Sequence, residues 1–327
     1  MSDPTALFRA VSWLLASALI AVSLDVQAQT WPSKPIRVIV PYAPGGTGDV
    51  FARLVSERLR APLGQSIVVE NRPGASGAIG TSMVAKAAPD GYTLLFGQTG
   101  EITINKSTMS LDHDPSKDLV PIVLVGNVAL ALVVNADSPY HSVKDLITAA
   151  QQEPGKLAFA SAGAMTPGRF AAETLALHAH VQMIHAAYKG AAPALTDLLG
   201  NHVAFFFSGM PAAIPHVKSG KLRLIAVSTA KRAAGTPETP TVEESGIPGF
   251  DFSLWGGFFA PTGTPVEIVT RFNREVNQIL AEQDVRSRLV QEGADVIANT
   301  PGEFAAFVRR QTEKYAQVIA QTGIKAE

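Results

Sequence analysis

Two serines are the side chains in this 327-residue sequence that most resemble nucleophiles. Ser161 lies in Phe159-Ala160-Ser161-Ala162-Gly163, which lacks the first glycine of a nucleophile elbow, and Ser76 lies in a glycine-rich turn. Either hydroxyl would need a base within hydrogen-bond reach, and the turns that carry these serines contain no histidine. We therefore expect Ser161 to be a capping or ligand-binding hydroxyl, with a secreted serine hydrolase as the alternative.

No residue pattern indicates a metal ion or a cofactor. The sequence has no cysteine, which removes thiolate ligands, disulfides and cysteine nucleophiles together. His178 and His180, the closest pair of histidines, would point apart on a helix. Gly46-Thr47-Gly48 continues into Asp49 rather than the lysine of a P-loop, and Phe51 stands where a dinucleotide fingerprint needs its third glycine.

Four glycine-rich or proline-rich turns each lead directly into a helical pattern. They cover residues 41–49, 73–80, 161–167 and 188–190, two in each half of the chain. Glycine lets backbone N–H groups approach a ligand, and a helix N-terminus offers unpaired donors with a partial positive charge. Because this combination suits a carboxylate or a phosphate, we expect an anion site in a cleft between two domains.

These turns alternate with the elements of an α/β protein with mostly parallel sheets. Residues 50–59 predict a helix with one apolar face, and Thr300-Pro301 with Glu303 predicts a capping box. No linker is evident, so two ordered strands, at 121–135 and 251–260, are expected to cross between the domains. The short apolar runs that predict buried strands are residues 36–40, 66–70, 93–96, 157–160, 203–207 and 222–228.

Composition excludes several classes of protein. Lys and Arg number 27 against 28 Asp and Glu, for a net charge of -1, which argues against nucleic-acid binding. Hydrophobic residues make up 46% and charged residues 17%, so the bulk of the chain is not disordered. The length suggests two domains, at roughly 150 residues each.

The N-terminus resembles a secretory signal. Residues 10–24 carry no charge, Arg9 precedes them, and Val26-Gln27-Ala28 supplies a small-residue cleavage site. This run is shorter than the ~20 residues that span a bilayer. A buried N-terminal helix or a membrane anchor is the alternative. We expect an exported chain in a Gram-negative periplasm that does not itself span a membrane.

Several short motifs are spread along the whole mature chain. They are Trp31-Pro32-Ser33-Lys34-Pro35-Ile36, Ala43-Pro44-Gly45-Gly46, Val69-Glu70-Asn71-Arg72-Pro73-Gly74, Pro89-Asp90-Gly91-Tyr92-Thr93, Tyr188-Lys189-Gly190, Gly220-Lys221-Leu222-Arg223, Thr239-Pro240-Thr241 and Ala260-Pro261-Thr262-Gly263-Thr264-Pro265. As a set they resemble one family, the solute-binding proteins of tripartite tricarboxylate transporters, known as the Bug (Bordetella uptake gene) or TctC family.

The resemblance implies a two-domain periplasmic-binding-protein fold of the Venus flytrap kind, similar to type II, with two crossing strands. Residues 1–28 would be the signal peptide, 29–128 with 251–327 a discontinuous first domain, and 129–250 the second. The ligand-binding residues that it implies are Tyr42, Ala43, Gly45, Gly46, Thr47, Asp49, Ser76, Gly77, Ala78, Gln98, Thr99, Glu101, Ser161, Gly163, Met165, Thr166, Tyr188, Lys189, Gly190 and Ser208.

The resemblance also implies a function without catalysis. The receptor would close over a small carboxylate, hold it by backbone N–H groups, hydroxyls and water, and deliver it to membrane permease subunits. The alternative is a ligand-presenting sensor component whose partner is a sensor kinase. We expect a monomer that binds neither nucleic acid nor a cofactor.

Two positions depart from the pattern common in the family. Gln98-Thr99-Gly100-Glu101 stands where many relatives carry His or uncharged polar residues, and Ser208 stands where an Asp is frequent. A charged Glu101 at the mouth of the cleft would repel a second ligand carboxylate by about 4 kcal/mol at about 4 Å. The ligand would then carry one carboxylate and one donor group. Alternatively, a lysine or arginine neutralises Glu101 and the ligand is a dicarboxylate.

The signal segment generates a direct prediction. Mature protein isolated from the periplasm should begin at Gln29, because cleavage is expected after Ala28. N-terminal sequencing checks this. Recovery of a chain that still starts at Met1 would contradict both the signal and the compartment.

Overall fold

The strands lie where the apolar runs predict them, within about two residues. The computed structural model describes residues 31–324, and the predicted signal segment lies outside the described residues. Residues from Lys34 onward form one unit. Its strands are β1 (Ile36–Val40), β2 (Ile67–Asn71), β3 (Thr93–Gln98), β4 (Leu119–Asn135), β5 (Ala158–Ser161), β6 (Ile184–Ala187), β7 (Phe205–Gly209), β8 (Leu222–Val227), β9 (Ser253–Pro261) and β10 (Ala294–Asp295).

Helices follow most of the strands. The shorter ones are the 3-10 helix η1 (Ala75–Gly77), the π-helix η2 (Gly100–Ile104), α4 (Asn105–Thr108) and α5 (Pro115–Asp118). The longer ones are α2 (Thr47–Leu63), α3 (Ala78–Ala85), α6 (Val143–Gln152), α7 (Pro167–Ala179), α8 (Ala191–Leu199), α9 (Met210–Lys218), α10 (Val266–Ala281), α11 (Gln283–Gln291) and α12 (Pro301–Thr322).

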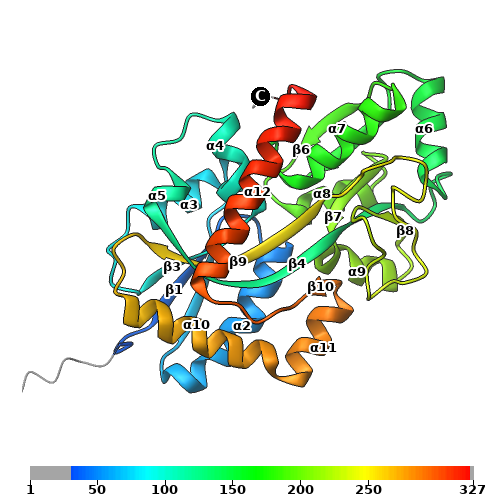
Figure 1. Ribbon diagram of the computed structural model, residues 1–327. Helices are drawn as coiled ribbons and strands as arrows, with labels where there is room; N and C mark the ends of the chain where they lie inside the picture. Colours follow the sequence, from blue (N-terminus) through cyan, green and yellow to red (C-terminus); the bar gives the residue numbers. More distant parts are fainter. Residues whose placement is uncertain (1–30, 325–327) are drawn as a thin grey trace, which may run out of the picture. The chain divides into compact units, whose positions relative to one another are not determined.

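Strand β4 joins two lobes, as the sequence predicts for residues 121–135. Its residues up to Ala129 pair with β9, whereas those from Leu130 onward pair with β7 and β8. The first lobe is built on β1, β2, β3, β9 and β10, and the second on β5, β6, β7 and β8. In Figure 1, β4 and β9 run side by side between the two lobes. The two crossing strands are thereby confirmed.

The prediction of mostly parallel sheets holds only for the strands on either side of β4 and β9. β1 pairs in parallel with β2 and β3, and β5 pairs in parallel with β6 and β7. Every pairing of β4 and β9 is antiparallel. The reason is that β9 returns the chain from the second lobe to the first alongside the strand that left it.

Helix α2 shows the predicted apolar face, with Phe51, Leu54, Val55 and Leu59 all buried. Thr300 and Glu303 form the predicted capping box of α12. Strand β6 has no counterpart in the prediction. It is a four-residue edge strand whose Ile184 side is exposed, so it lacks the continuous apolar run of a buried strand.

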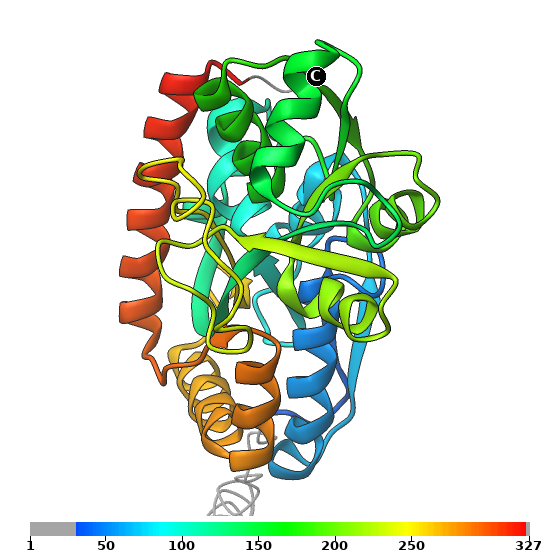
Figure 2. The same cartoon turned by 90° about the vertical axis from the view of Figure 1, so that its right-hand side faces the viewer.

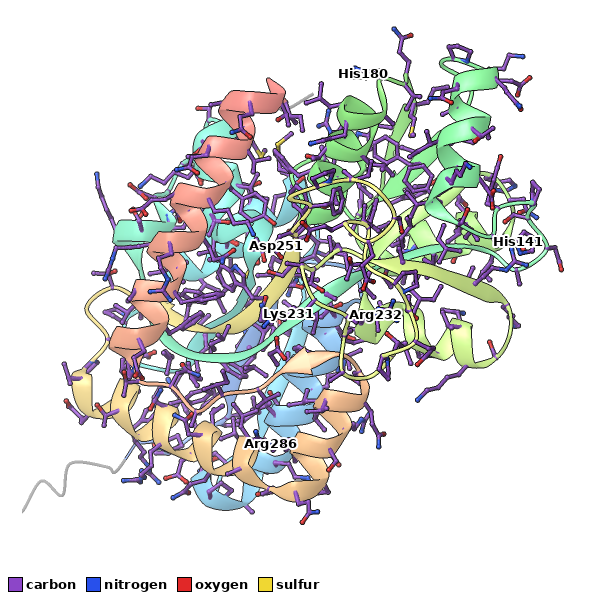
Figure 3. The ribbon with its side chains drawn as sticks, turned by 45° about the vertical axis from the view of Figure 1, so that its right-hand side comes forward. His141, His180, Lys231, Arg232, Asp251 and Arg286 are labelled. Carbon is purple, nitrogen blue, oxygen red and sulfur yellow. The ribbon has the colours of Figure 1, made fainter. Side chains whose placement is uncertain are left out.

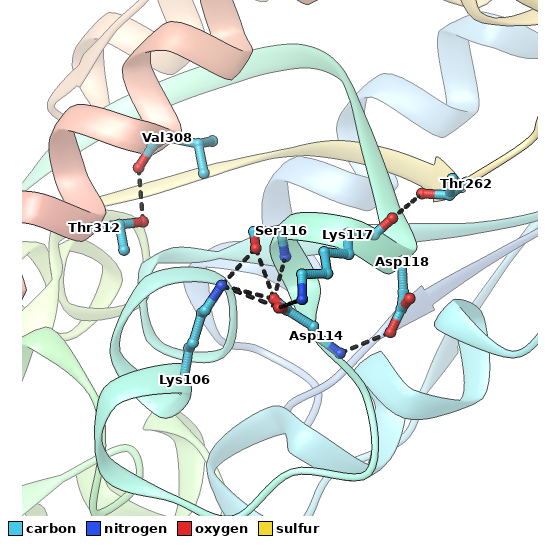
Figure 4. Close-up of polar contacts among 8 residues, drawn as sticks. All are labelled: Lys106, Asp114, Ser116, Lys117, Asp118, Thr262, Val308 and Thr312. Carbon is cyan, nitrogen blue, oxygen red and sulfur yellow. Dashed lines mark hydrogen bonds and ion pairs between the residues drawn. The ribbon is translucent and has the colours of Figure 1, made fainter.

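Polar contacts fix the start of β4 against the end of β9 (Figure 4). Asp114 caps α5 by accepting from the Ser116 N–H at 3.0 Å, and the Lys106 ammonium donates to the same carboxylate at 2.9 Å. Thr262, just after β9, donates through its N–H to the Asp118 carbonyl at 2.9 Å. The start of β4 and the end of β9 are therefore held together in the first lobe.

Helix α12 contacts both lobes. It packs on β4 and η2 and reaches α7, where Phe170 and Tyr315 meet edge to face with ring centroids 5.9 Å apart. Figure 2 shows α12, in red, running past both lobes. Near its start, Phe304 packs against Gly257 of β9, where a Cβ would lie 2.6 Å from the phenyl ring and 2.4 Å from the Val123 carbonyl oxygen. Only glycine fits between α12 and the crossing strands here.

Gly257→Ala should therefore destabilise the protein by about 1–3 kcal/mol, because the added methyl group meets a backbone oxygen that cannot move aside cheaply. Gly302→Ala is the control, since its nearest neighbour is an atom 4.0 Å away and alanine favours a helix. Urea unfolding midpoints measure both changes. A Gly257→Ala midpoint equal to that of Gly302→Ala would contradict the packing argument.

Candidate ligand-binding site

Four helix N-termini converge on one cavity, which we call the inner cavity. Gly46, Thr166, Gly190 and Gly209 occupy the N-cap positions of α2, α7, α8 and α9. The space inside the inner cavity is about 490 Å³ in all, including the part that is open to solvent. Its lining residues are Tyr42, Gly46, Thr47, Gln98, Gly100, Leu130, Ala162, Thr166, Pro167, Gly168, Ala191, Phe206, Phe207, Gly209 and Leu254.

The first turn is shaped by Asp49. Gly45 has a φ of +82°, which favours glycine, and its N–H donates to the Asp49 carboxylate at 3.0 Å. Arg53 and Asn71 donate to the other carboxylate oxygen. Burial would raise the pKa of Asp49, but these three hydrogen bonds outweigh it and lower that pKa. Asp49 therefore stays ionised and holds the turn.

The first turn of α7 packs closely on strand β7. A Cβ at Gly168 would lie 2.4 Å from the Phe207 carbonyl oxygen, so only glycine allows this approach. Thr166 occupies the N-cap position, yet its hydroxyl donates to the Gly163 carbonyl at 2.8 Å and makes no capping bond to the helix. The Thr166 hydroxyl therefore stabilises the preceding turn rather than α7.

The turns of the two lobes touch across the site. The Ala43 N–H donates to the Lys189 carbonyl at 3.1 Å, and the Met165 N–H donates to the Ser76 hydroxyl at 3.1 Å. Gly190 has a φ of +145°, and a Cβ there would lie 2.9 Å from Ala43. The lobes are thus in contact around the inner cavity.

An outer cavity lies beside the inner one and shares Tyr42 and Ala162 with it. Its remaining lining residues are Gly74, Ala75, Ser76, Gly77, Gly163, Ala164, Ala187, Tyr188 and Lys189. Tyr42 therefore stands between the two cavities. Its hydroxyl lies 3.2 Å from the Ser76 carbonyl oxygen and 2.8 Å from a Glu101 carboxyl oxygen.

No charged side chain lines the inner cavity among the residues that the structure describes. Lys231, Arg232 and Arg286, labelled in Figure 3, are exposed on the outside, as is His141. Attraction of an anion into the cavity would therefore depend on the backbone N–H groups at the helix N-termini.

Glu101 is fully buried, in the layer behind the inner cavity. Burial raises its pKa to about 8, although hydrogen bonds from the Gln98 N–H, at 2.5 Å, and from Tyr42 act in the opposite direction. No lysine or arginine pairs with Glu101 among the described residues. The side chain is therefore mostly a neutral carboxylic acid at pH 7.

Tyr42 connects Glu101 to the turn before α3. Its hydroxyl donates to the Glu101 carboxyl at 2.8 Å and lies 3.2 Å from the Ser76 carbonyl oxygen. The structure corrects the expected position of Glu101, which is buried behind the inner cavity rather than at the mouth of the cleft. The expected alternative, a lysine or arginine paired with Glu101, is absent among residues 31–324.

The residues predicted for ligand binding fall into three groups. Tyr42, Gly46, Thr47, Gln98 and Thr166 line the inner cavity. Ser76, Gly77, Gly163, Tyr188 and Lys189 line the outer cavity. The remainder line neither cavity and support the turns, namely Ala43, Gly45, Asp49, Ala78, Thr99, Glu101, Ser161, Met165, Gly190 and Ser208.

Sequence reasoning missed the apolar wall of the inner cavity. Leu130 of β4, Phe206 and Phe207 of β7, and Leu254 of β9 form it. Each lies in a strand pattern typical of a buried core, which gave no signal of a cavity. Pro167 and Gly168 could have been found, because they directly follow a turn already singled out.

Ser161 has a histidine within reach, which the sequence did not reveal. Its hydroxyl lies 2.7 Å from Nε2 of His185, on the neighbouring strand β6, and donates to the Gly163 carbonyl at 2.9 Å. Ser161 is fully buried and lines neither cavity. It neither caps α7 nor reaches a space that a substrate could enter.

Two lobes joined by crossing strands, with helix N-termini aimed at a cavity between them, define a solute-binding protein of the periplasmic-binding-protein fold. The chain matches the tripartite tricarboxylate transporter family receptor, TctC, over residues 51–324, and it belongs to that family.

Relatives and solved structures agree with this family. The chain is 37% identical to protein BugT of Bordetella pertussis over 323 residues, which cover 98% of each chain. The structure of periplasmic binding protein BugD matches with 33% identity and a TM-score of 0.86, covering 91% of this chain and 100% of that one. The structure of Rhodopseudomonas palustris Rpa4515 with adipate matches with 34% identity and a TM-score of 0.88, covering 90% and 99%.

Burial of Glu101 predicts a pH dependence of stability. Its pKa is raised from 4.5 to about 8 in the folded protein, so stability falls as the pH rises through that window, by up to about 1.4 kcal/mol per pH unit. Glu101→Gln keeps the neutral shape and should remove this loss. The free energy of unfolding of Glu101→Gln, measured by urea unfolding, should exceed that of wild type by an amount that grows from pH 4.5 to pH 8.

The exposed Glu267→Gln, in the first turn of α10, is the matched control and should follow the wild-type pH profile. Parallel profiles for wild type and Glu101→Gln would show instead that Glu101 is ionised in the folded protein.

Proposed function

We propose that this protein is a periplasmic receptor that binds a small carboxylate in the inner cavity and presents it to the membrane subunits of a tripartite tricarboxylate-type transporter. The observation that carries the proposal is the convergence of four helix N-termini on a cavity without charged side chains. Each terminus offers unpaired N–H donors and roughly half a positive charge. An anion is the ligand that satisfies them.

A carboxylate fits this arrangement better than a phosphate. A doubly charged phosphate in a buried site would need cationic side chains, and none lines the inner cavity among the described residues. Rpa4515, a neighbour at 34% identity, is described with adipate, which is a carboxylate.

Closure of two domains over the ligand is the second part of the proposal. We assign residues 29–128 and 251–327 to one domain and 129–250 to the other. The change of partners along β4 at Ala129 and Leu130 supports this division. The hydrogen bonds from Ala43 to Lys189 and from Met165 to Ser76 would then form when the domains close.

Location and partners rest on the family and on the N-terminal segment. A signal peptide cut after Ala28 would export the chain to the periplasm, where membrane permease subunits would recognise the closed form. Within residues 31–324, no helix is both long and apolar enough to cross a membrane. A sensor kinase as partner would use the same closed form.

A thermal-shift screen of the exported protein against mono-, di- and tricarboxylates tests the proposal. A ligand at 100 times its dissociation constant should stabilise the folded state by about 2.7 kcal/mol. Inorganic phosphate and neutral sugars are the comparison ligands. Absence of stabilisation by every carboxylate would contradict the proposal.

Gly46→Val should abolish binding while leaving folding nearly unchanged. Gly46 has a φ of -78°, which any residue adopts, and a Cβ there would lie at ordinary distances of 3.7 and 3.9 Å from its neighbours. The valine methyl groups would occupy the anion position at the start of α2. Calorimetric titration and the melting temperature separate the two effects. Equal losses of affinity and stability would assign Gly46 to the fold alone.

A further inference from the structure

The side chain of Gln98 is a buried amide that faces the inner cavity. Its residue is only 6% exposed and lines the cavity, and its amide makes no hydrogen bond with the residues that the structure describes. The amide lies against the first turn of α2, where a Cβ at Gly48 would be 2.6 Å from its nitrogen. An amide without a partner in the protein is available to a hydrogen-bonding group of a ligand in the cavity.

The backbone around Gln98 is held by its neighbours. The Gln98 N–H donates to Glu101 at 2.5 Å, and the Trp255 N–H donates to the Thr99 hydroxyl at 3.0 Å. Thr103 donates to the Thr99 carbonyl at 2.5 Å. Since the strand end and η2 are fixed in this way, the Gln98 side chain leaves the backbone from a fixed position beside the inner cavity.

A carboxamide recognises a particular chemistry. It offers two donors and one acceptor and carries no charge. A hydroxyl or amide on the ligand could both donate to it and accept from it. A carboxylate could only accept, so the amide oxygen would stay unpaired and a second charge would be buried without a cation. Leu130, Phe206 and Leu254, which also line the inner cavity, have apolar side chains.

We propose that Gln98 determines the specificity of the inner cavity, and that the ligand is a monocarboxylate that carries a neutral hydrogen-bonding group, a hydroxyl or a carboxamide, at its other end. The inference rests on the proposed function. The carboxylate lies at the helix N-termini, and the neutral group meets the Gln98 amide.

The outer cavity allows a different ligand, a dicarboxylate that extends through both cavities. A dicarboxylate could pass Tyr42 and place its second carboxylate beside Lys189. Lys189 is exposed, however, so its attraction for an anion is weakened by solvent. Tyr42, held by Glu101 and Ser76, also stands between the two cavities.

Matched probes test the proposal on the exported protein. Hexanoate, 6-hydroxyhexanoate, adipamate and adipate share a six-carbon chain and differ only at the far end. Butyrate, 4-hydroxybutyrate, succinamate and succinate repeat the comparison with four carbons. Calorimetric titration should show that a hydroxyl or carboxamide end binds about tenfold or more tightly than either the methyl or the carboxylate end of the same series.

Variants assign the preference to Gln98. Gln98→Leu should remove the advantage of the hydroxyl and carboxamide ends while hexanoate or butyrate keeps its affinity. Gly48→Ala displaces only the flexible end of Gln98 and should reduce the same selectivity ratio several-fold without unfolding α2. Gln151→Leu, on the exposed face of α6, is the matched control and should change nothing.

Three results would overturn the inference. If adipate or succinate binds best and Lys189→Gln removes that binding, the ligand spans both cavities, and the carboxylate receptor stands while the role of Gln98 falls. If Gln98→Leu weakens every probe equally, Gln98 is structural. If no carboxylate of any kind binds, the proposed function fails as well.

Discussion

The unpaired N–H groups at the starts of α2, α7, α8 and α9 are the constraint on which the rest of the site depends. Each must face either solvent or a ligand, and their convergence makes an anion the natural partner. The close approach of these turns needs glycine, as at Gly168 against Phe207 and Gly190 against Ala43. The glycines are therefore needed for the turns to pack closely together. This packing brings the N–H groups of the four helix N-termini to one place, where an anion could accept from them.

Behind these helix N-termini, a group of buried residues is connected by hydrogen bonds. Glu101, Tyr42 and Ser76 form a chain of hydrogen bonds that links η2 to the turn before α3. A charged carboxylate in this position would cancel part of the potential from the helix termini, whereas the protonated acid does not. The same burial that raises the pKa of Glu101 thus keeps the cavity attractive to an anion.

The family, the crossing strands and the turns that line the two cavities could be predicted from the sequence, because glycine-rich turns before helices have local signatures. The sequence could not give the state of Glu101, since burial depends on how η2 packs behind the cavity. The sequence also could not predict that Leu130, Phe206 and Leu254 line the inner cavity. A strand residue that lines a cavity has the same pattern as one that fills a core.

The lack of charged side chains in the inner cavity also has a consequence for how binding depends on ionic strength. Receptors that hold anions with surface lysines or arginines lose affinity and association rate as salt screens those charges. An anion held by the N-termini of α2, α7, α8 and α9 would instead be attracted by dipoles at hydrogen-bonding distance, where mobile ions do not enter. A receptor built in this way would retain its ligand at low and at high ionic strength alike.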